Sequence, residues 1–384
     1  MIDFGTEVRA ALKAQGKSLR GAARELHYDV AYLSRVINGK QAPSSEVIQA
    51  VNEYLGLSLK AEDASGPQDD EMDAWELARR VQASDVGNAT LERLEHTFDR
   101  LAMAYPRATP EDLLRQVRKH SGYVVKLLDG RKTLAEHRRL LVLGGWLSLL
   151  AATVHIDLMQ NDAATARLEA AATLAREARH PDIEAWCYET EAWRVLTDGD
   201  YVQAVDLSRA AQEVAPSDSS ALIQASAQEG RAHARLGNAT ETYAAIERVQ
   251  ELSASLGTPD TPDHHYRYDP SKSLSYAATT LAWLGDPAAE PYAREVIRRL
   301  SPSNDLTKWP RRVASANIDL ALVLLKENRL DEACDSAQKA ILSGRVVPSN
   351  HWRALEVVKA VEVRQLPESV DLREAYQGLK AIEQ

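Results

Sequence analysis

The sequence contains little cysteine and no apolar run long enough to cross a membrane. Its 384 residues include two cysteines, Cys187 and Cys334, too few for a disulfide framework or a four-ligand zinc site. The apolar stretch at residues 140–154 is 15 residues long, whereas a membrane span needs about 20. We therefore expect a buried helix there. The N-terminus shows neither a basic nor an apolar leader region, which predicts a cytoplasmic protein.

Catalytic and cofactor motifs are also missing. The sequence has no GxxxxGK[ST], GxGxxG, HExxH, GxSxG or CxxC pattern. These are common short signatures of phosphate, dinucleotide, metal and nucleophile sites. We therefore expect no enzyme activity and no cofactor.

The charge of the chain is distributed unevenly. The net charge is −10, which taken alone argues against nucleic acid as a partner. Residues 1–60, however, carry eight basic and six acidic side chains, so this segment has a net charge of +2 and the remainder −12. A slightly basic N-terminal segment therefore precedes a long acidic body.

The first sixty residues predict four short helices. Apolar residues recur at helical spacing over residues 4–14, 19–26, 30–37 and 44–55. Ser18 and Asp29 are suited to cap the second and third helices, and Asn38-Gly39 suits the end of the third. Two short helices joined by about three residues in a compact bundle form a helix-turn-helix, whose second helix enters the DNA major groove.

Residues 18–44, SLRGAARELHYDVAYLSRVINGKQAPS, resemble the Cro/XRE-type helix-turn-helix. The turn has His27 where that family usually has glycine. The resemblance implies that Val30, Ala31 and Arg35 reach base edges. Arg35 is the strongest candidate, because arginine can pair with guanine through two hydrogen bonds. It further implies that Tyr32 and Ser34 touch the DNA backbone or the bases. It also implies that the DNA phosphates are contacted by Arg20, Arg24 and Lys40. The alternative for each is a solvated surface side chain.

One such domain binds DNA weakly by itself. We therefore expect a homodimer on double-stranded DNA, bound to a palindromic operator with half-sites about one helical turn apart. Residues 1–60 form this predicted DNA-binding domain. Residues 61–72 are acidic, include Gly66-Pro67 and lack large apolar side chains before Met72. They predict a flexible linker to a body at residues 73–384.

The body shows helical periodicity with a repeat. Helix-breaking positions at Asn161, Asp200, Asn238, Asp286 and Asn328 are separated by 39, 38, 48 and 42 residues. Such self-similarity indicates stacked helical hairpins. The segments at 199–211 and 327–341 resemble tetratricopeptide repeats. The predicted fold class is therefore all-α, a helix-turn-helix bundle followed by an α-solenoid of TPR-like hairpins at 182–214, 219–256, 271–300 and 310–342.

A proline-containing loop at residues 257–270 interrupts the repeat. It gathers His264, His265, Tyr266, Arg267 and Tyr268. A long loop of this composition either contacts a ligand or partner, or folds back to cap the concave groove. The two histidines have no apparent third ligand, so we expect no metal site. On the first helices of two hairpins, Arg231 and Asn317 are further candidates for contacting a ligand, or else structural.

The whole architecture resembles XRE regulators with TPR-like bodies, common in high-GC bacteria. It more distantly resembles the peptide-responsive RRNPP regulators. The resemblance implies a dimeric, sequence-specific transcriptional regulator whose body senses a peptide or small-molecule effector. The alternative is a protein–protein interaction scaffold that is tethered to DNA by its N-terminal domain.

Overall fold

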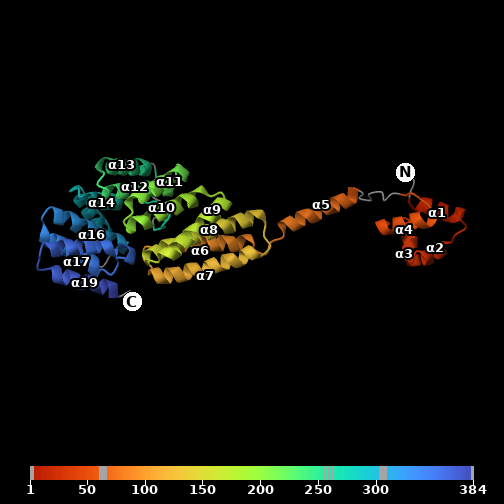
Figure 1. The fold of residues 1–384 in the computed structure, drawn as a ribbon, viewed down its shortest axis with the longest axis horizontal. Coiled ribbons are helices and arrows are strands. Elements are labelled where there is room, and N and C mark those ends of the chain that lie inside the picture. The colour runs from red at the N-terminus through yellow and green to blue at the C-terminus, as the bar shows by residue number, and fades with distance from the viewer. Residues whose placement is uncertain are drawn as a thin grey trace. The chain divides into compact units, whose positions relative to one another are not determined.

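The computed structural model describes residues 4–59, 67–254, 256–257, 260–261, 263–270, 272–301 and 309–381. Within these ranges it contains nineteen α-helices, one short 3-10 helix and no β-strand, which confirms the all-α fold class. The chain divides into two compact units (Figure 1), an N-terminal unit at Met1–Gln82 and a body at Ala83–Gln384.

The N-terminal unit begins with the four predicted helices, each within one residue of its expected position. The second helix is capped by Ser18 Oγ, which accepts a hydrogen bond from the Gly21 amide at 3.0 Å. The third is capped by Asp29 Oδ1, which accepts from the Tyr32 amide at 2.9 Å. The helices are α1 (Phe4–Ala14), α2 (Leu19–Glu25), α3 (Val30–Ile37) and α4 (Ser45–Leu55).

Small residues let these helices pack closely. Ala22 and Ala23 of α2 are buried against the core that includes Leu33 and Val36 of α3. At Gly5 of α1, an added Cβ would lie 1.9 Å from the Ile37 carbonyl oxygen. Glycine is therefore required there, because α1 meets the end of α3 backbone to backbone.

The turn between α2 and α3 contains a strained residue. His27 has a φ of 57°, in the left-handed region that costs a residue with a side chain about 1–2 kcal/mol. This is the position where the Cro/XRE-type pattern usually has glycine. The chain therefore makes the same turn with histidine, at a cost in stability.

The expected linker differs from the structure at its C-terminal end. Residues 61–66 lie outside the described residues, but residues 67–72 begin helix α5 (Pro67–Gln82). Proline suits the first position of a helix, because its fixed φ is helical and its missing amide hydrogen has no partner there in any case. Gly66-Pro67 thus precedes a helix, and the compact body begins at Ala83.

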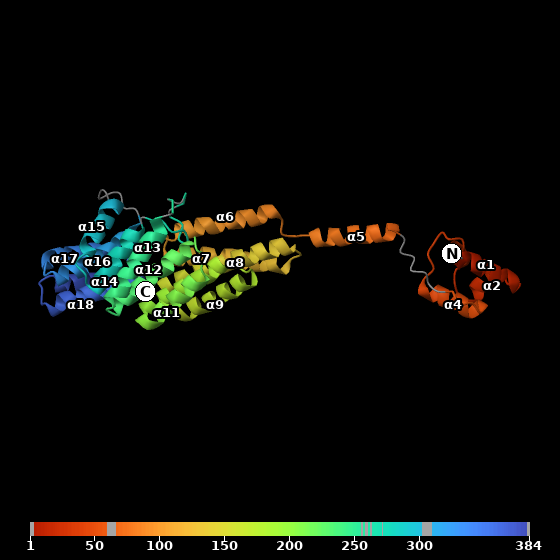
Figure 2. The ribbon, with the colours of Figure 1, turned by 90° about the horizontal axis from the view of Figure 1, so that it is seen from above.

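The body is an array of antiparallel helical hairpins (Figures 1 and 2). The predicted hairpins are confirmed as α10–α11, α12–α13, α14–α15 and α16–α17, with α8–α9 before them and α18–α19 after them. The inner helices, α8, α10, α12, α14, α16 and α18, each contact the next one. Their bounds are Leu134–Asp157, Pro181–Thr197, Ser220–Arg235, Lys272–Leu284, Pro310–Lys326 and His351–Val363.

The outer helices follow their inner partners in sequence. Two further helices, α6 (Asn88–Ala104) and α7 (Pro110–Asp129), pack on α8 at the start of the array. A 3-10 helix, η1 (Pro348–Asn350), precedes α18. The outer helices are α9 (Asn161–Glu177), α11 (Tyr201–Val214), α13 (Ala239–Ala254), α15 (Ala289–Leu300), α17 (Leu330–Leu342) and α19 (Ser369–Ala381).

Helix α8 contains the apolar stretch noted in the sequence. By length and composition alone it could cross a membrane, but 83% of its apolar window is buried inside the body. Its apolar side chains contact α6, α7, α9 and α10. The expectation of a buried helix is confirmed.

The end of α8 is bound by the distant C-terminal half of the body. Asp157, at the end of α8, accepts a hydrogen bond from Arg311 Nη1 of α16 at 2.9 Å, and Ser349 Oγ of η1 lies 3.4 Å from its other oxygen. Arg311 Nη2 also donates to the Ala108 carbonyl oxygen at 2.9 Å. The hairpins therefore close around an interior space.

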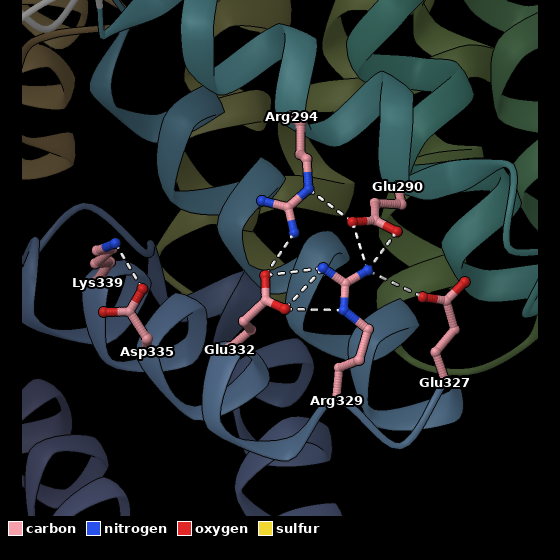
Figure 3. A network of polar contacts seen from close by, with 7 residues as sticks. All are labelled: Glu290, Arg294, Glu327, Arg329, Glu332, Asp335 and Lys339. Atoms are coloured by element: carbon pink, nitrogen blue, oxygen red, sulfur yellow. Dashed lines mark hydrogen bonds and ion pairs between the residues drawn. The ribbon is translucent and has the colours of Figure 1, made fainter.

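Exposed ion pairs join the outer helices α15 and α17 (Figure 3). Arg294 of α15 contacts Glu332 of α17 at 2.8 Å, and Arg329, just before α17, contacts Glu290 of α15 at 2.8 Å. Because this network faces solvent, each pair contributes at most about 1 kcal/mol. It supports the stacking of two hairpins.

Candidate nucleic-acid interface and interior cavity

Helix α3 presents a continuous face away from its core. Leu33, Val36 and Ile37 are buried, while Val30, Ala31 and Arg35 are exposed and Ser34 is half-buried. In a helix, residues 30, 31, 34 and 35 share the face opposite residues 33, 36 and 37. Four of the five candidates on α3, all except Tyr32, therefore lie together on the outward face of the second helix of the helix-turn-helix.

Neighbouring side chains orient this face. Arg35 Nε donates a hydrogen bond to Gln41 Oε1 at 3.2 Å, and Ser34 Oγ accepts from Asn38 Nδ2 at 3.3 Å. The half-buried Tyr32 ring lies 6.0 Å from that of Tyr28, between centroids. Gln41 was missed by the sequence analysis, since only the folded loop after α3 brings it beside Arg35.

The three predicted phosphate-contacting residues are all exposed. Arg20 and Arg24 lie on α2 and Lys40 follows α3. Within the described residues, none of the three forms an ion pair with a carboxylate, so their charges are not neutralised by the protein itself. Such charges can attract phosphate groups.

The body contains two adjoining cavities of about 200 and 190 Å³, both partly open to solvent. Each is far larger than the roughly 10–15 Å³ that one water molecule needs. Six inner helices contribute to their walls, from Asp157 of α8 to Arg353 of α18. The two cavities share seven lining residues, which are Tyr105, Trp193, Arg231, Lys272, Tyr276, Arg311 and Arg312.

Cationic side chains dominate this interior. Two of them have carboxylate partners. Arg311 pairs with Asp157 at 2.9 Å, and Arg353 pairs with Asp319. Within the described part of the chain, Arg231, Lys272 and Arg312 have no carboxylate at ion-pair distance. The Arg231 guanidinium stacks 4.2 Å from the Tyr276 ring centroid, and Lys272 Nζ donates to the Arg267 carbonyl oxygen at 2.9 Å.

Burial shifts the pKa of two groups that line the cavities. Lys272 is 8% exposed, and burial, reinforced by Arg312, lowers its pKa to about 7. Burial raises the pKa of the Glu189 carboxyl of α10 to about 7 as well, although Gln224 and Arg231 oppose that rise. Both groups therefore titrate near neutral pH.

The proline-containing loop packs into the body. Tyr266 is 4% exposed and lies among Phe98, Trp146 and Trp186, with its Oη 3.2 Å from Thr153 Oγ. The His265 amide donates to the Ala102 carbonyl oxygen at 3.2 Å. Most of the described part of this loop therefore folds back onto the body, as in the second of the two alternatives. Pro259 and Pro262, which also belong to it, lie outside the described residues.

The predicted ligand candidates do not gather in one place. Arg231 lines both cavities and His265 lines one of them. His264 and Arg267 instead border a separate pocket beside α6, and buried Tyr268 packs in its own apolar cluster. Burial lowers the pKa of His264 to about 4.

Asn317 also lies away from the two cavities. It borders a groove between α16 and α17, and its Nδ2 donates to the Val313 carbonyl oxygen at 2.9 Å.

The sequence analysis missed the lining residues Lys272, Arg312 and Arg353. The signal in the sequence that could have pointed to a cationic lining was the pair Arg311-Arg312 at the start of a helix. No group of three residues suited to bind a metal occurs in the ranges that the structure describes.

Comparison with known proteins identifies the N-terminal unit. A helix-turn-helix family model matches residues 8–61. No curated protein matches the chain. Among solved structures, Bacillus thuringiensis PlcR in complex with the peptide PapR7 and DNA is similar over 100% of this chain and 95% of its own. The sequence identity is 10% and the TM-score is 0.28. The family match covers residues 8–61 alone, and it shows that the N-terminal unit of this chain contains a helix-turn-helix domain.

Proposed function

We propose that this chain is a cytoplasmic, dimeric, sequence-specific regulator whose helical body binds a peptide or small-molecule effector. The observation that carries the proposal is the outward face of α3, on which Val30, Ala31 and Arg35 are exposed. This is the helix that enters the major groove in a helix-turn-helix.

Each residue of the predicted interface receives a role in this proposal. Arg35, oriented by Gln41, reads a guanine, and Val30 and Ala31 contact thymine methyl groups. Tyr32 and Ser34 contact the DNA backbone or the neighbouring bases. The exposed charges of Arg20, Arg24 and Lys40 bind phosphates, which positions the domain without selecting a sequence.

Replacing Arg35 by alanine should abolish sequence discrimination at one base pair. A bidentate arginine–guanine contact contributes about 1–3 kcal/mol, so the affinity for the selected site should fall roughly 5- to 150-fold. Footprinting and competition binding at one fixed salt concentration measure this loss. Lys13→Ala is the matched control, because it removes an exposed positive charge of α1 outside α2 and α3. Its effect should be several-fold smaller.

Two outcomes would count against the proposal. An unchanged footprint with Arg35→Ala would remove α3 from base recognition. Binding by the unaltered chain that ignores sequence would favour the scaffold tethered to DNA, whose main task is contact with other proteins.

The body would regulate DNA binding by linkage. A ligand changes DNA affinity only by favouring one arrangement of the two N-terminal domains over another. The array of hairpins supports this role, because it contains cavities lined by six helices that are far apart in sequence. An effector should therefore shift both the melting temperature of the body and the affinity for the operator.

A further inference from the structure

The interior of the body has an excess of unsatisfied positive charge and of hydrogen-bond donors. Arg231, Lys272 and Arg312 project from three different inner helices into the shared wall of the two cavities. As described above, they have no carboxylate partner among the described residues. Of the carboxylates that line the cavities, Asp157 and Asp319 pair with Arg311 and Arg353, and Asp263 pairs with Arg107. The remaining one, Glu189, has no ion pair among the described residues, and burial raises its pKa to about 7.

The unsatisfied polar atoms of the lining are all donors. Among the described residues, the buried lining atoms without a hydrogen-bond partner are Trp186 Nε1, Gln228 Nε2, Arg231 Nε and Arg353 Nε. A buried donor without an acceptor is costly, and an unpaired buried charge is more so. The body at residues 83–384 has a net charge of −7, yet it leaves these three cations without an ion-pair partner.

We infer that this interior binds the anionic oxygen group of an organic ligand, a carboxylate or a phosphate, through Arg231, Lys272 and Arg312. The inference deepens the proposed function and rests on its claim that the body binds an effector. Charged oxygens satisfy guanidinium and ammonium donors with the strongest class of protein hydrogen bond. Trp193 and Tyr276, which line both cavities, provide flat apolar surface for the remainder of the ligand.

Three inner helices would hold the anion together. Arg231 lies on α12, Lys272 on α14 and Arg312 on α16, and these helices contact one another in sequence. In the ligand-free body they present like charges to one space, which repel. An anion converts this repulsion into attraction, so its binding tightens the stacking of three hairpins.

The first test uses sulfate as the probe on the full chain. The melting temperature is measured as sulfate replaces chloride at constant ionic strength, for the unaltered chain and for Arg231→Met, Lys272→Met and the control Arg115→Gln. Arg115 is exposed on α7, lines neither cavity, and pairs only with Asp112 in the described structure. Because sulfate stabilises folded proteins in general, the response of the control defines the background.

The unaltered chain and Arg115→Gln should respond equally to sulfate. The two cavity variants should bind it at least about tenfold more weakly, which is the effect of losing one charge-assisted hydrogen bond. Without sulfate, Arg231→Met should melt no lower than the unaltered chain, because it removes an unpaired buried charge. A cavity variant that folds and responds to sulfate like the control would overturn the inference.

Aromatic anions distinguish the two sources of the oxygen group. Phenyl phosphate and phenylacetate carry the two candidate groups, and phenylacetamide is a neutral control of similar shape. Stabilisation by phenyl phosphate alone assigns a phosphate-bearing ligand, and stabilisation by phenylacetate assigns a carboxylate. Equal stabilisation by phenylacetamide would contradict recognition of charge.

Sulfate affinity should also depend on pH. Lys272 faces Arg312 of α16, Asp263 and Asp269 of the loop, and Glu189 of α10. As the pH rises from 6 to 8, Lys272 loses its positive charge and Glu189 gains its negative charge, and both changes oppose an anion. Sulfate keeps its charge in this range, so its affinity should fall several-fold. An affinity that is constant or that rises would exclude Lys272 from the site.

These results are separable from the DNA-binding claim. If no anion stabilises the chain while the operator footprint persists, the anion site is wrong and the regulator remains. If anions bind but the footprint is absent, the proposed function fails and the cavity remains a ligand site.

Discussion

Replacing Asp157 by alanine is expected to lower the free energy of unfolding of the body by about 3–5 kcal/mol. The carboxylate is 1% exposed and pairs with Arg311, which lies 154 residues away in the sequence. Removing one member of a buried ion pair leaves the other charge without a partner, and this produces a cost of that size. Urea unfolding followed by tryptophan fluorescence measures it.

Two further substitutions sharpen this prediction. Asp157→Asn should cost less than alanine, because the amide keeps the shape of the side chain and its oxygen still accepts the hydrogen bond from Arg311. Asp335→Asn, which breaks the exposed pair with Lys339 of α17 (Figure 3), should cost at most about 1 kcal/mol. If Asp157→Ala is as mild as Asp335→Asn, the closing of the array around its interior does not depend on this contact.

Replacing Tyr266 by alanine is expected to cost about 3–5 kcal/mol, the range for truncating a buried aromatic side chain. Its ring lies 5.1 Å from Trp146 and 5.1 Å from Trp186 between centroids, and 6.1 Å from Phe98. The loop therefore supplies a central part of the core between α6, α8 and α10 rather than a mobile cover. The same urea titration measures the effect.

The tyrosine prediction has two controls. Tyr266→Phe keeps the ring and loses only the contact between Oη and Thr153, so it should cost about 1 kcal/mol. Tyr123→Ala removes a tyrosine that is 45% exposed on α7 and should cost less than Tyr266→Ala by a clear margin. Equal effects of Tyr266→Ala and Tyr123→Ala would show that the loop is not part of the core.

Local signals account for what the sequence predicted well. The first four helices are marked by cap residues such as Ser18 and Asp29, and the hairpins of the body by breaks such as Gly199-Asp200. Caps and turns act within three or four residues, so they can be recognised in one sequence. The buried helix α8 is likewise explained by its own composition.

Long-range contacts account for what the sequence could not predict. The pairing of Asp157 with Arg311 joins residues that no local pattern connects. The side of an inner helix that faces the cavity depends on how hairpins twist against each other, and therefore Arg231 lines the cavity whereas Asn317 does not. The loop at Tyr266 could be recognised as unusual, but its burial depends on α6, α8 and α10 together.

The central claim is that α3 reads a specific DNA sequence as part of a dimer. Selection of bound sequences from random double-stranded DNA by the full chain tests it most directly. The account predicts one enriched site with two-fold symmetry and half-sites about 10–10.5 base pairs apart, or a multiple of that spacing. It also predicts that Arg35→Ala loses a guanine preference in each half-site. A bound pool without enrichment, or enrichment unchanged by Arg35→Ala, would contradict it.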